Sequence, residues 1–169
     1  MEWATADQHD HACELLFEMS ERWAARYRPK EPINLHGVRL PPPSYRGNNP
    51  YNGFTAEERI LTDRVIVLLR RKGLLPKPSQ CEVCGASERI GYHGENYYDP
   101  FALIQVCFPC HMAIHRRARA PLSWAKRVSK TSLAVGWLDQ LPQREVNFAT
   151  WLKNRKKTGA DYGCLVPKN

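Results

Sequence analysis

Two pairs of cysteines offer the most specific chemistry in this sequence. Cys81-Glu-Val-Cys84 and Cys107-Phe-Pro-Cys110 share the C-x-x-C spacing, and 22 residues lie between the pairs. A C-x-x-C turn lets both sulfurs reach one ion about 2.3 Å away, so two such turns can complete a tetrahedral four-thiolate zinc site. Gly85 follows the first pair and would relieve crowding where the backbone reverses. The spacing therefore predicts a structural Zn²⁺ site, with redox-active dithiols as the alternative interpretation.

Three histidines, His93, His111 and His115, lie close to these cysteines in the sequence. His111 and His115 are four residues apart on a helix that we expect to begin at the last of the cysteines, so both rings would point from one face. His93 lies at the end of the first strand of an expected hairpin, which pairs residues 89–92 with residues 103–106. Folding the hairpin onto the helix would bring the three imidazoles together. A single histidine of this kind is more often structural than catalytic, but three converging histidines favour a function.

The two cysteine pairs, the Tyr92-His93 dipeptide and the two helix histidines together resemble the HNH family of nucleases, also called ββα-metal or His-Me finger enzymes. The zinc-knuckle subgroup found in phage and mobile-element proteins is the most similar, and the resemblance covers about residues 78–118. It implies that His111 and His115 bind one catalytic divalent cation (Mg²⁺, Mn²⁺ or Zn²⁺) and that His93 is the general base. The implied activity is the hydrolysis of phosphodiester bonds in nucleic acid, with DNA as the expected substrate.

Two positions depart from the pattern of this family. The residue before the base is commonly a His or Asp metal ligand, and here it is Tyr92. The Asn that gives the family its middle letter would lie at Ala102. Asp99 or Glu95 could complete the metal shell instead, because carboxylates are good ligands for hard divalent cations. The alternative is a catalytically degenerate, zinc-stapled module that binds nucleic acid or a protein.

The positive charge of the chain is concentrated in one segment. The whole sequence has 25 Lys and Arg against 17 Asp and Glu, a net charge of +8. Residues 116–157 hold 11 basic and two acidic side chains, whereas residues 1–115 are nearly balanced. This asymmetry predicts nucleic acid as a partner, and a solvated basic surface is the alternative. The side chains expected to hold phosphates are Arg116, Arg117, Arg119, Lys126, Arg127 and Lys130.

The elements that must position these residues are mostly helical. We expect an α+β fold, mostly α, in which a small zinc-stapled ββα-metal unit has helices before and after it. The expected regions are an N-terminal helical region at 1–77 with a Pro-rich loop at 29–53, the zinc-bound HNH-like ββα unit at 78–120, a basic helical region at 121–157, and a tail at 158–169.

The spacing of apolar residues, together with residues that start or stop helices, predicts the individual helices. We expect helices over residues 10–28, 56–72, 123–130, 132–141 and 144–157. Thr55 and Glu58 form a capping box at the start of the second helix. The second helix should bury Ile60, Val65, Val67 and Leu68, and the anchors of the C-terminal region should be Trp124, Trp137, Phe148 and Trp151.

Composition excludes several other classes of protein. The longest aliphatic run, Val65–Leu69, is far too short to span a bilayer. The first residues are acidic where a signal peptide would be basic, so we expect an intracellular, cytoplasmic protein without membrane contact. A homodimer would place two active sites on opposite DNA strands, but no residue requires it. A nuclease toxin or effector domain is a third, weaker interpretation.

Overall fold

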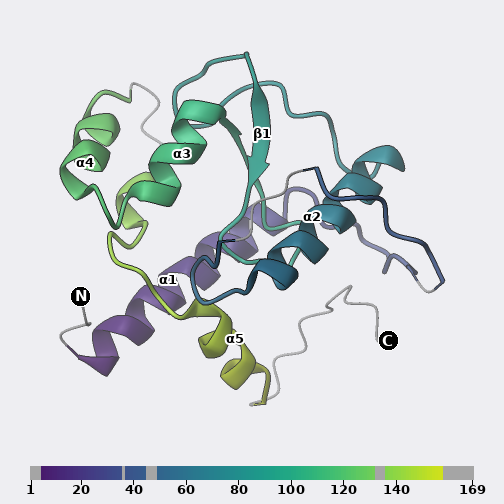
Figure 1. Ribbon diagram of the computed structural model, residues 1–169, viewed down its shortest axis with the longest axis horizontal. Coiled ribbons are helices and arrows are strands. Elements are labelled where there is room, and N and C mark those ends of the chain that lie inside the picture. Colours follow the sequence, from purple (N-terminus) through teal and green to yellow (C-terminus); the bar gives the residue numbers. More distant parts are fainter. Residues whose placement is uncertain (1–4, 36, 45–48, 132–135, 158–169) are drawn as a thin grey trace.

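The computed structural model describes residues 5–35, 37–44, 49–131 and 136–157. These residues form an α+β fold that is mostly helical, as predicted, with one two-stranded antiparallel sheet (Figure 1). The elements in chain order are α1 (Ala6–Ala24), α2 (Ala56–Arg71), β1 (Ile90–His93), β2 (Ile104–Cys107), α3 (Phe108–Arg116), α4 (Pro121–Ser129), the 3-10 helix η1 (Leu138–Gln140) and α5 (Phe148–Lys157). None of the described helices is both long and apolar enough to cross a membrane.

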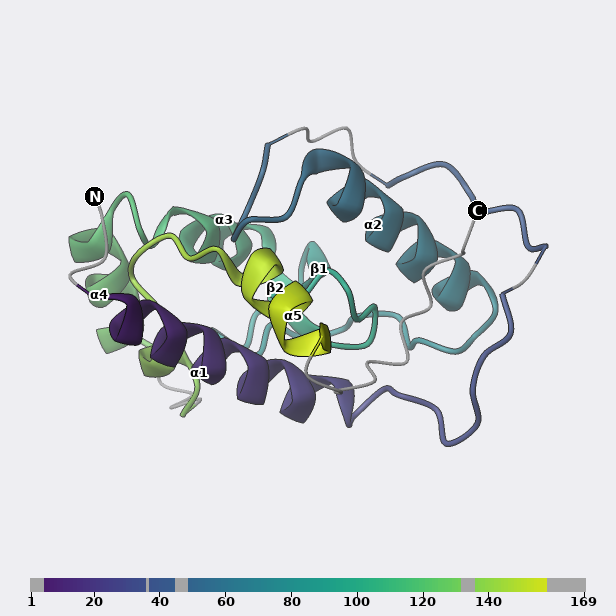
Figure 2. The same cartoon turned by 90° about the horizontal axis from the view of Figure 1, so that it is seen from below.

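The hairpin of β1 and β2 leads directly into α3, which is the arrangement that the sequence predicts. Ile90 pairs with Cys107 and His93 pairs with Ile104 in an antiparallel register. The helix α3 begins at Phe108, two residues before the predicted start, because the extended Cys107 forms its N-cap and a proline fits the first turn. The helices α1 and α2 flank the hairpin, and α5 lies beside α1 (Figure 2).

One hydrophobic core joins segments from the three long predicted regions. It contains Leu16 of α1, Ile114 of α3, Trp124 of α4 and Phe148 of α5, all of them at most 2 % exposed. A second cluster packs α2 against the segment that precedes β2. Residues 1–77, 78–120 and 121–157 therefore share their core rather than having one each, which ties the hairpin to helices from both ends of the chain.

Local capping explains where the first two helices begin. The helix α1 starts at Ala6, earlier than predicted, because the Thr5 side chain accepts a hydrogen bond from the backbone N–H of Gln8. The capping box at the start of α2 is confirmed. Val65 and Leu68 are buried as predicted, but Ile60 and Val67 are only half-buried because they lie at the edge of the apolar face.

Two of the three predicted C-terminal helices are shorter than predicted in the described residues, whereas α4 begins at Pro121, two residues before its predicted start. Residues 132–135 lie outside the described residues, and only Leu138–Gln140 of the predicted helix 132–141 is helical. The helix α5 begins at Phe148 rather than at residue 144, because the Asn147 side chain accepts from the N–H of Thr150 and caps it there. The anchors Trp124, Trp137 and Phe148 are buried and Trp151 is half-buried, while the tail at 158–169 lies outside the described residues.

Truncation of a core leucine should destabilise the protein far more than truncation of a surface leucine. We expect Leu16→Ala, at a fully buried position in α1, to lower the free energy of unfolding by about 2–5 kcal/mol. The matched control is Leu122→Ala in α4, at a position 87 % exposed, which should change it by less than about 0.5 kcal/mol. Urea denaturation measures both, and equal losses would contradict the described core.

Candidate functional site

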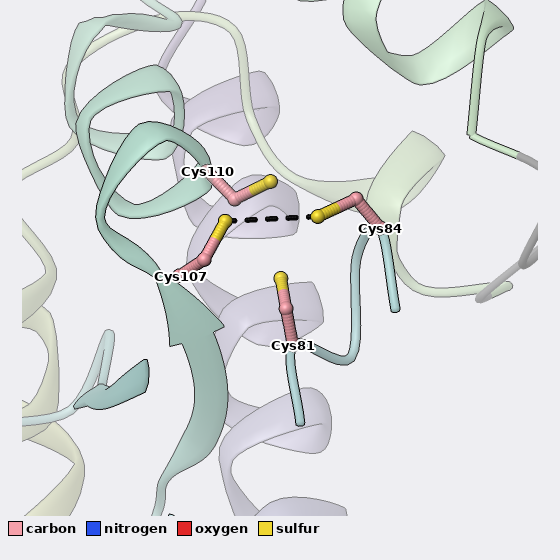
Figure 3. Close-up of side chains that lie close together, drawn as sticks. All are labelled: Cys81, Cys84, Cys107 and Cys110. Carbon is pink, nitrogen blue, oxygen red and sulfur yellow. Dashed lines mark hydrogen bonds between the residues drawn. The ribbon is translucent and has the colours of Figure 1, made fainter. Parts of the chain in front are cut away.

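The four cysteines of the C-x-x-C pairs converge on one point. Cys81 and Cys84 come from the loop before the hairpin, Cys107 from the end of β2 and Cys110 from the first turn of α3 (Figure 3). Their sulfurs lie within 4.8 Å of one another, and the Cys84 and Cys107 sulfurs are 3.6 Å apart. Sulfurs bound to one tetrahedral zinc ion would lie roughly 3.8 Å apart. The cluster therefore has the dimensions of a zinc site.

The backbone turn and the charged groups around the cysteine cluster suit metal binding. Gly85 has a φ of +75° and its N–H donates to the Cys81 carbonyl, so the turn needs the conformation that glycine adopts freely. Burial, followed by the hydrogen bond with Cys107, raises the pKa of the Cys110 thiol well above its usual value. The guanidinium of Arg127 lies 3.5 Å from the Cys110 sulfur and supplies one positive charge. Four crowded thiols can become thiolates when a bound metal ion displaces their protons.

The three predicted histidines form a second cluster. One ring nitrogen of each of His93, His111 and His115 lies within 4.8 Å of the others, and the Nε2 atoms of His111 and His115 are 2.9 Å apart. Burial, followed by the electrostatic effect of His93, lowers the pKa of His111 to about 3 and that of His115 to about 2. Both rings are thus neutral near pH 7 and present lone pairs, which metal ligation requires.

A buried carboxylate orients His93. Glu95 is fully buried, and its Oε1 lies 3.0 Å from His93 Nε2. Burial by itself would raise the pKa of Glu95, but the positive charge of Arg117 and the hydrogen bond with His93 hold it well below its usual value. Because an ionised carboxylate only accepts hydrogen bonds, Nε2 of His93 must donate. The other nitrogen, Nδ1, is buried without a hydrogen-bond partner among the described residues.

The structure corrects the prediction that Arg117 binds a phosphate. It is only 3 % exposed, and its guanidinium donates to both oxygens of Glu95 at 3.0 and 3.2 Å and to the Pro142 carbonyl at 2.7 Å. A backbone phosphate could not reach it without breaking this buried ion pair. Arg117 therefore balances the charge of Glu95 rather than contacting a surface ligand.

The carboxylates of Glu95 and Asp99 do not join either ligand cluster among the described residues. Glu95 is engaged by His93, Arg117, Tyr51 and Asn52. Asp99 accepts from the Phe101 N–H and pairs with Arg28. The prediction that one of them completes the metal shell therefore does not fit the described arrangement, although Glu95 contacts a proposed ligand.

The remaining predicted phosphate-binding residues divide into two groups. Arg116, the last residue of α3, and Arg119, three residues later, are exposed, and Arg119 pairs with Glu145 at 3.4 Å. Lys126, Arg127 and Lys130 instead line a cavity of about 330 Å³ together with Cys84. The second group is thus gathered beside the cysteine cluster.

Several residues around the histidine cluster have no signal in the sequence. Tyr51 and Asn52 donate to Glu95 from the predicted loop 29–53, where the turn-rich composition indicates no long-range contact. The Tyr51 ring lies 4.3 Å from the His115 ring, measured between centroids. Arg59 of α2 lies over the Tyr51 ring, and a helical arginine has no pattern that predicts such a contact.

The two departures from the HNH pattern have structural explanations. Alternation along β1 turns Tyr92 away from His93, and its hydroxyl donates to the Pro76 carbonyl at 2.7 Å. Ala102 is fully buried. A Cβ atom at Gly94, which follows His93, would lie only 3.0 Å from the Ala102 carbonyl oxygen, so the chain is closely packed here.

Comparisons of the chain with protein-family models, with curated proteins and with solved structures find no match.

The cysteine cluster should control zinc content. We expect Cys110→Ser to contain one zinc ion fewer per chain than the unaltered protein and to unfold at a lower temperature, because the binding free energy of a structural zinc contributes to folding. Cys13→Ala is the control, because Cys13 is buried in α1 outside the cluster and its variant should keep the zinc. Elemental analysis after dialysis measures both, and equal zinc contents would contradict the site.

Replacement of Arg117, whose charge balances Glu95, should strongly destabilise the fold. We expect Arg117→Met to lower the free energy of unfolding by about 3–5 kcal/mol, because it leaves a buried carboxylate without its charge partner. Arg119→Met, two residues further along, removes only an exposed ion pair and should cost less than about 1 kcal/mol. Chemical denaturation compares the two, and a similar small effect of both would refute the role of the buried pair.

Proposed function

We propose that this chain is a divalent-metal-dependent endonuclease of the HNH type, which hydrolyses phosphodiester bonds in nucleic acid, with double-stranded DNA as the expected substrate. The observation that supports this proposal is the convergence of His93, His111 and His115 beside a cluster of four cysteines. The same residues carry the resemblance of the sequence to HNH nucleases.

The donor set of the histidine cluster fits a divalent cation. His93 Nδ1 is a buried nitrogen without a hydrogen-bond partner among the described residues, and coordination would satisfy it. His111 and His115 are held neutral by burial, so their lone pairs are available. Three imidazole ligands leave room in the coordination shell for water and a substrate oxygen.

The chain contributes orientation and charge balance. When bound, a cation at the three histidines would supply Lewis-acid chemistry, polarising the scissile phosphate and stabilising charge on the leaving oxygen. Glu95 fixes the ring of His93 through Nε2, so that Nδ1 would be the nitrogen available to a metal ion, and carboxylates behind ligating histidines commonly have this role. Arg117 keeps Glu95 ionised in its buried position.

The role of His93 follows from its two nitrogens. Since Nε2 donates to Glu95, only Nδ1 can bind a cation or accept a proton from water. The sequence-based prediction makes His93 the general base. His93 lies in the ligand cluster through one of its ring nitrogens, which favours the third-ligand role, and in this proposal His93 holds the metal with His111 and His115.

A basic surface would bind the rest of the nucleic acid. Arg116, Lys126 and Lys130 are exposed and carry charges of the sign that backbone phosphates require. The structural zinc at the cysteine cluster would fix α3, on which two of the proposed catalytic-metal ligands lie. Zinc would thus serve as a structural cofactor, and the second cation as the catalytic one.

Plasmid cleavage with Mg²⁺, Mn²⁺ or Zn²⁺ tests the activity. We expect the unaltered protein to nick or cut DNA, and His111→Ala to be slower by at least about 100-fold, because removal of a direct ligand should cost more than the 10- to 100-fold effect of an outer-shell partner. His11→Ala is the control, because His11 is exposed on α1 outside the cluster. His93→Ala separates the two roles: a variant that loses the metal supports ligation, and one that keeps the metal but not cleavage supports the base.

Absence of cleavage with every metal, while DNA binding is retained, would overturn the enzymatic proposal. The chain would then be a zinc-stapled binding module, which is the alternative that Tyr92 and Ala102 favour. The Tyr92 hydroxyl donates to the Pro76 carbonyl and alanine has no ligand atom, so neither position supplies the metal ligand that HNH nucleases have there.

A further inference from the structure

Arg59 is a cation that contacts Tyr51 at the edge of the histidine cluster and has no role in the function proposed above. It lies in the first turn of α2, and the centre of its guanidinium is 5.6 Å from the Tyr51 ring centroid and 5.1 Å from that of Tyr97. The Tyr51 ring in turn packs against His115, with 4.3 Å between centroids. Two tyrosines thus hold this guanidinium, and one of them, Tyr51, also contacts the histidine cluster.

The hydrogen-bonding capacity of Arg59 is only partly used. One terminal nitrogen donates to the Asn49 carbonyl, whereas its Nε is buried and has no partner among the described residues. A buried N–H without an acceptor costs free energy that a ligand oxygen could recover. Guanidinium groups bind phosphate oxygens well, because their planar array of donors matches the geometry of the oxyanion.

The charge of Arg59 is also uncompensated locally. Within the described part of the chain, no carboxylate forms an ion pair with it, whereas Arg117, on the other side of Tyr51, is neutralised by Glu95. An anion bound at the histidines would therefore meet a positive charge that is already oriented.

We propose that Arg59 binds the phosphate of the substrate at the histidine cluster, an assignment that rests on the proposed nuclease function. A non-bridging phosphate oxygen would accept from the guanidinium while the phosphate lies over the three histidines. Stacking on Tyr51 and Tyr97 restricts the rotamers of the long side chain, which reduces the entropy that binding must remove. Arg59 is thus a substrate-binding residue, distinct from the metal ligands.

Binding of thymidine 5′-monophosphate, measured apart from cleavage, tests this assignment. The protein with zinc at its cysteines is titrated with Co²⁺, whose visible absorption reports both metal binding at the histidines and the approach of the nucleotide phosphate. We expect Arg59→Gln to bind Co²⁺ within about twofold of the unaltered protein but the nucleotide about 10- to 100-fold more weakly, as for the loss of charge-assisted hydrogen bonds. Arg59→Lys, which keeps the charge without the planar donors, should be intermediate.

Arg70→Gln is the matched control. Arg70 is exposed in the last turn of the same helix, and its variant removes the same charge without touching the histidine cluster, so nucleotide and metal affinity should be unchanged. Equal nucleotide affinity of Arg59→Gln and the unaltered protein would overturn the assignment. A parallel loss of Co²⁺ and nucleotide affinity would overturn it as well, because Arg59 would then support the fold of the cluster.

Failure of the proposed function has a different signature. If the unaltered protein binds no Co²⁺ at the histidines, the nuclease proposal fails. Calorimetric titration with the nucleotide alone then tests whether Arg59 binds a phosphate. Metal-free binding that Arg59→Gln weakens would support an anion site at this arginine. Absence of nucleotide binding would overturn both proposals.

Discussion

The buried negative charge of Glu95 is the constraint on which the histidine cluster depends. A carboxylate without solvent must find donors, and Glu95 finds them on three segments far apart in the sequence: the loop of Tyr51 and Asn52, the strand end at His93 and the end of α3 at Arg117. Desolvation of both members of such a pair is expensive, so the arrangement stabilises the fold only while it is complete. The same hydrogen bonds that satisfy the charge also determine the orientation of His93.

The helix α3 connects the two candidate metal clusters. Cys110 and His111 are consecutive residues on it, yet one side chain joins the four cysteines and the other joins the three histidines. Consecutive helical side chains point about 100° apart, so a single turn can serve both clusters. A metal ion at the cysteines would fix the first turn of α3 and thereby the position of His111. The proposed structural and catalytic metal ligands would then be separated by one peptide bond.

Local patterns predicted much of this protein, and long-range charge balance explains what they missed. The C-x-x-C pairs, the helical spacing of His111 and His115, and the capping box of α2 are local, and each forms as the sequence indicates. Arg117 lies in a run of arginines that predicts a basic surface, and only its distant partner Glu95 distinguishes it from Arg116. Tyr51 and Arg59 reach the cluster through tertiary packing, for which neither the loop composition nor the helical period provides a signal.

The docking of α1 on α5 has a consequence for the order of folding. The contact between the Cys84 and Cys107 sulfurs joins residues that are 23 positions apart in the sequence. The hydrogen bond from the Asn147 N–H to His9 joins residues that are 138 positions apart, and Phe17 of α1 also packs on Trp151 of α5. Loop-closure entropy increases with length, and non-local contacts slow folding. The hairpin and α3 can therefore assemble around their thiols early. Part of the apolar face of α1 remains uncovered until α5 has been synthesised, so this helix needs protection in the nascent chain.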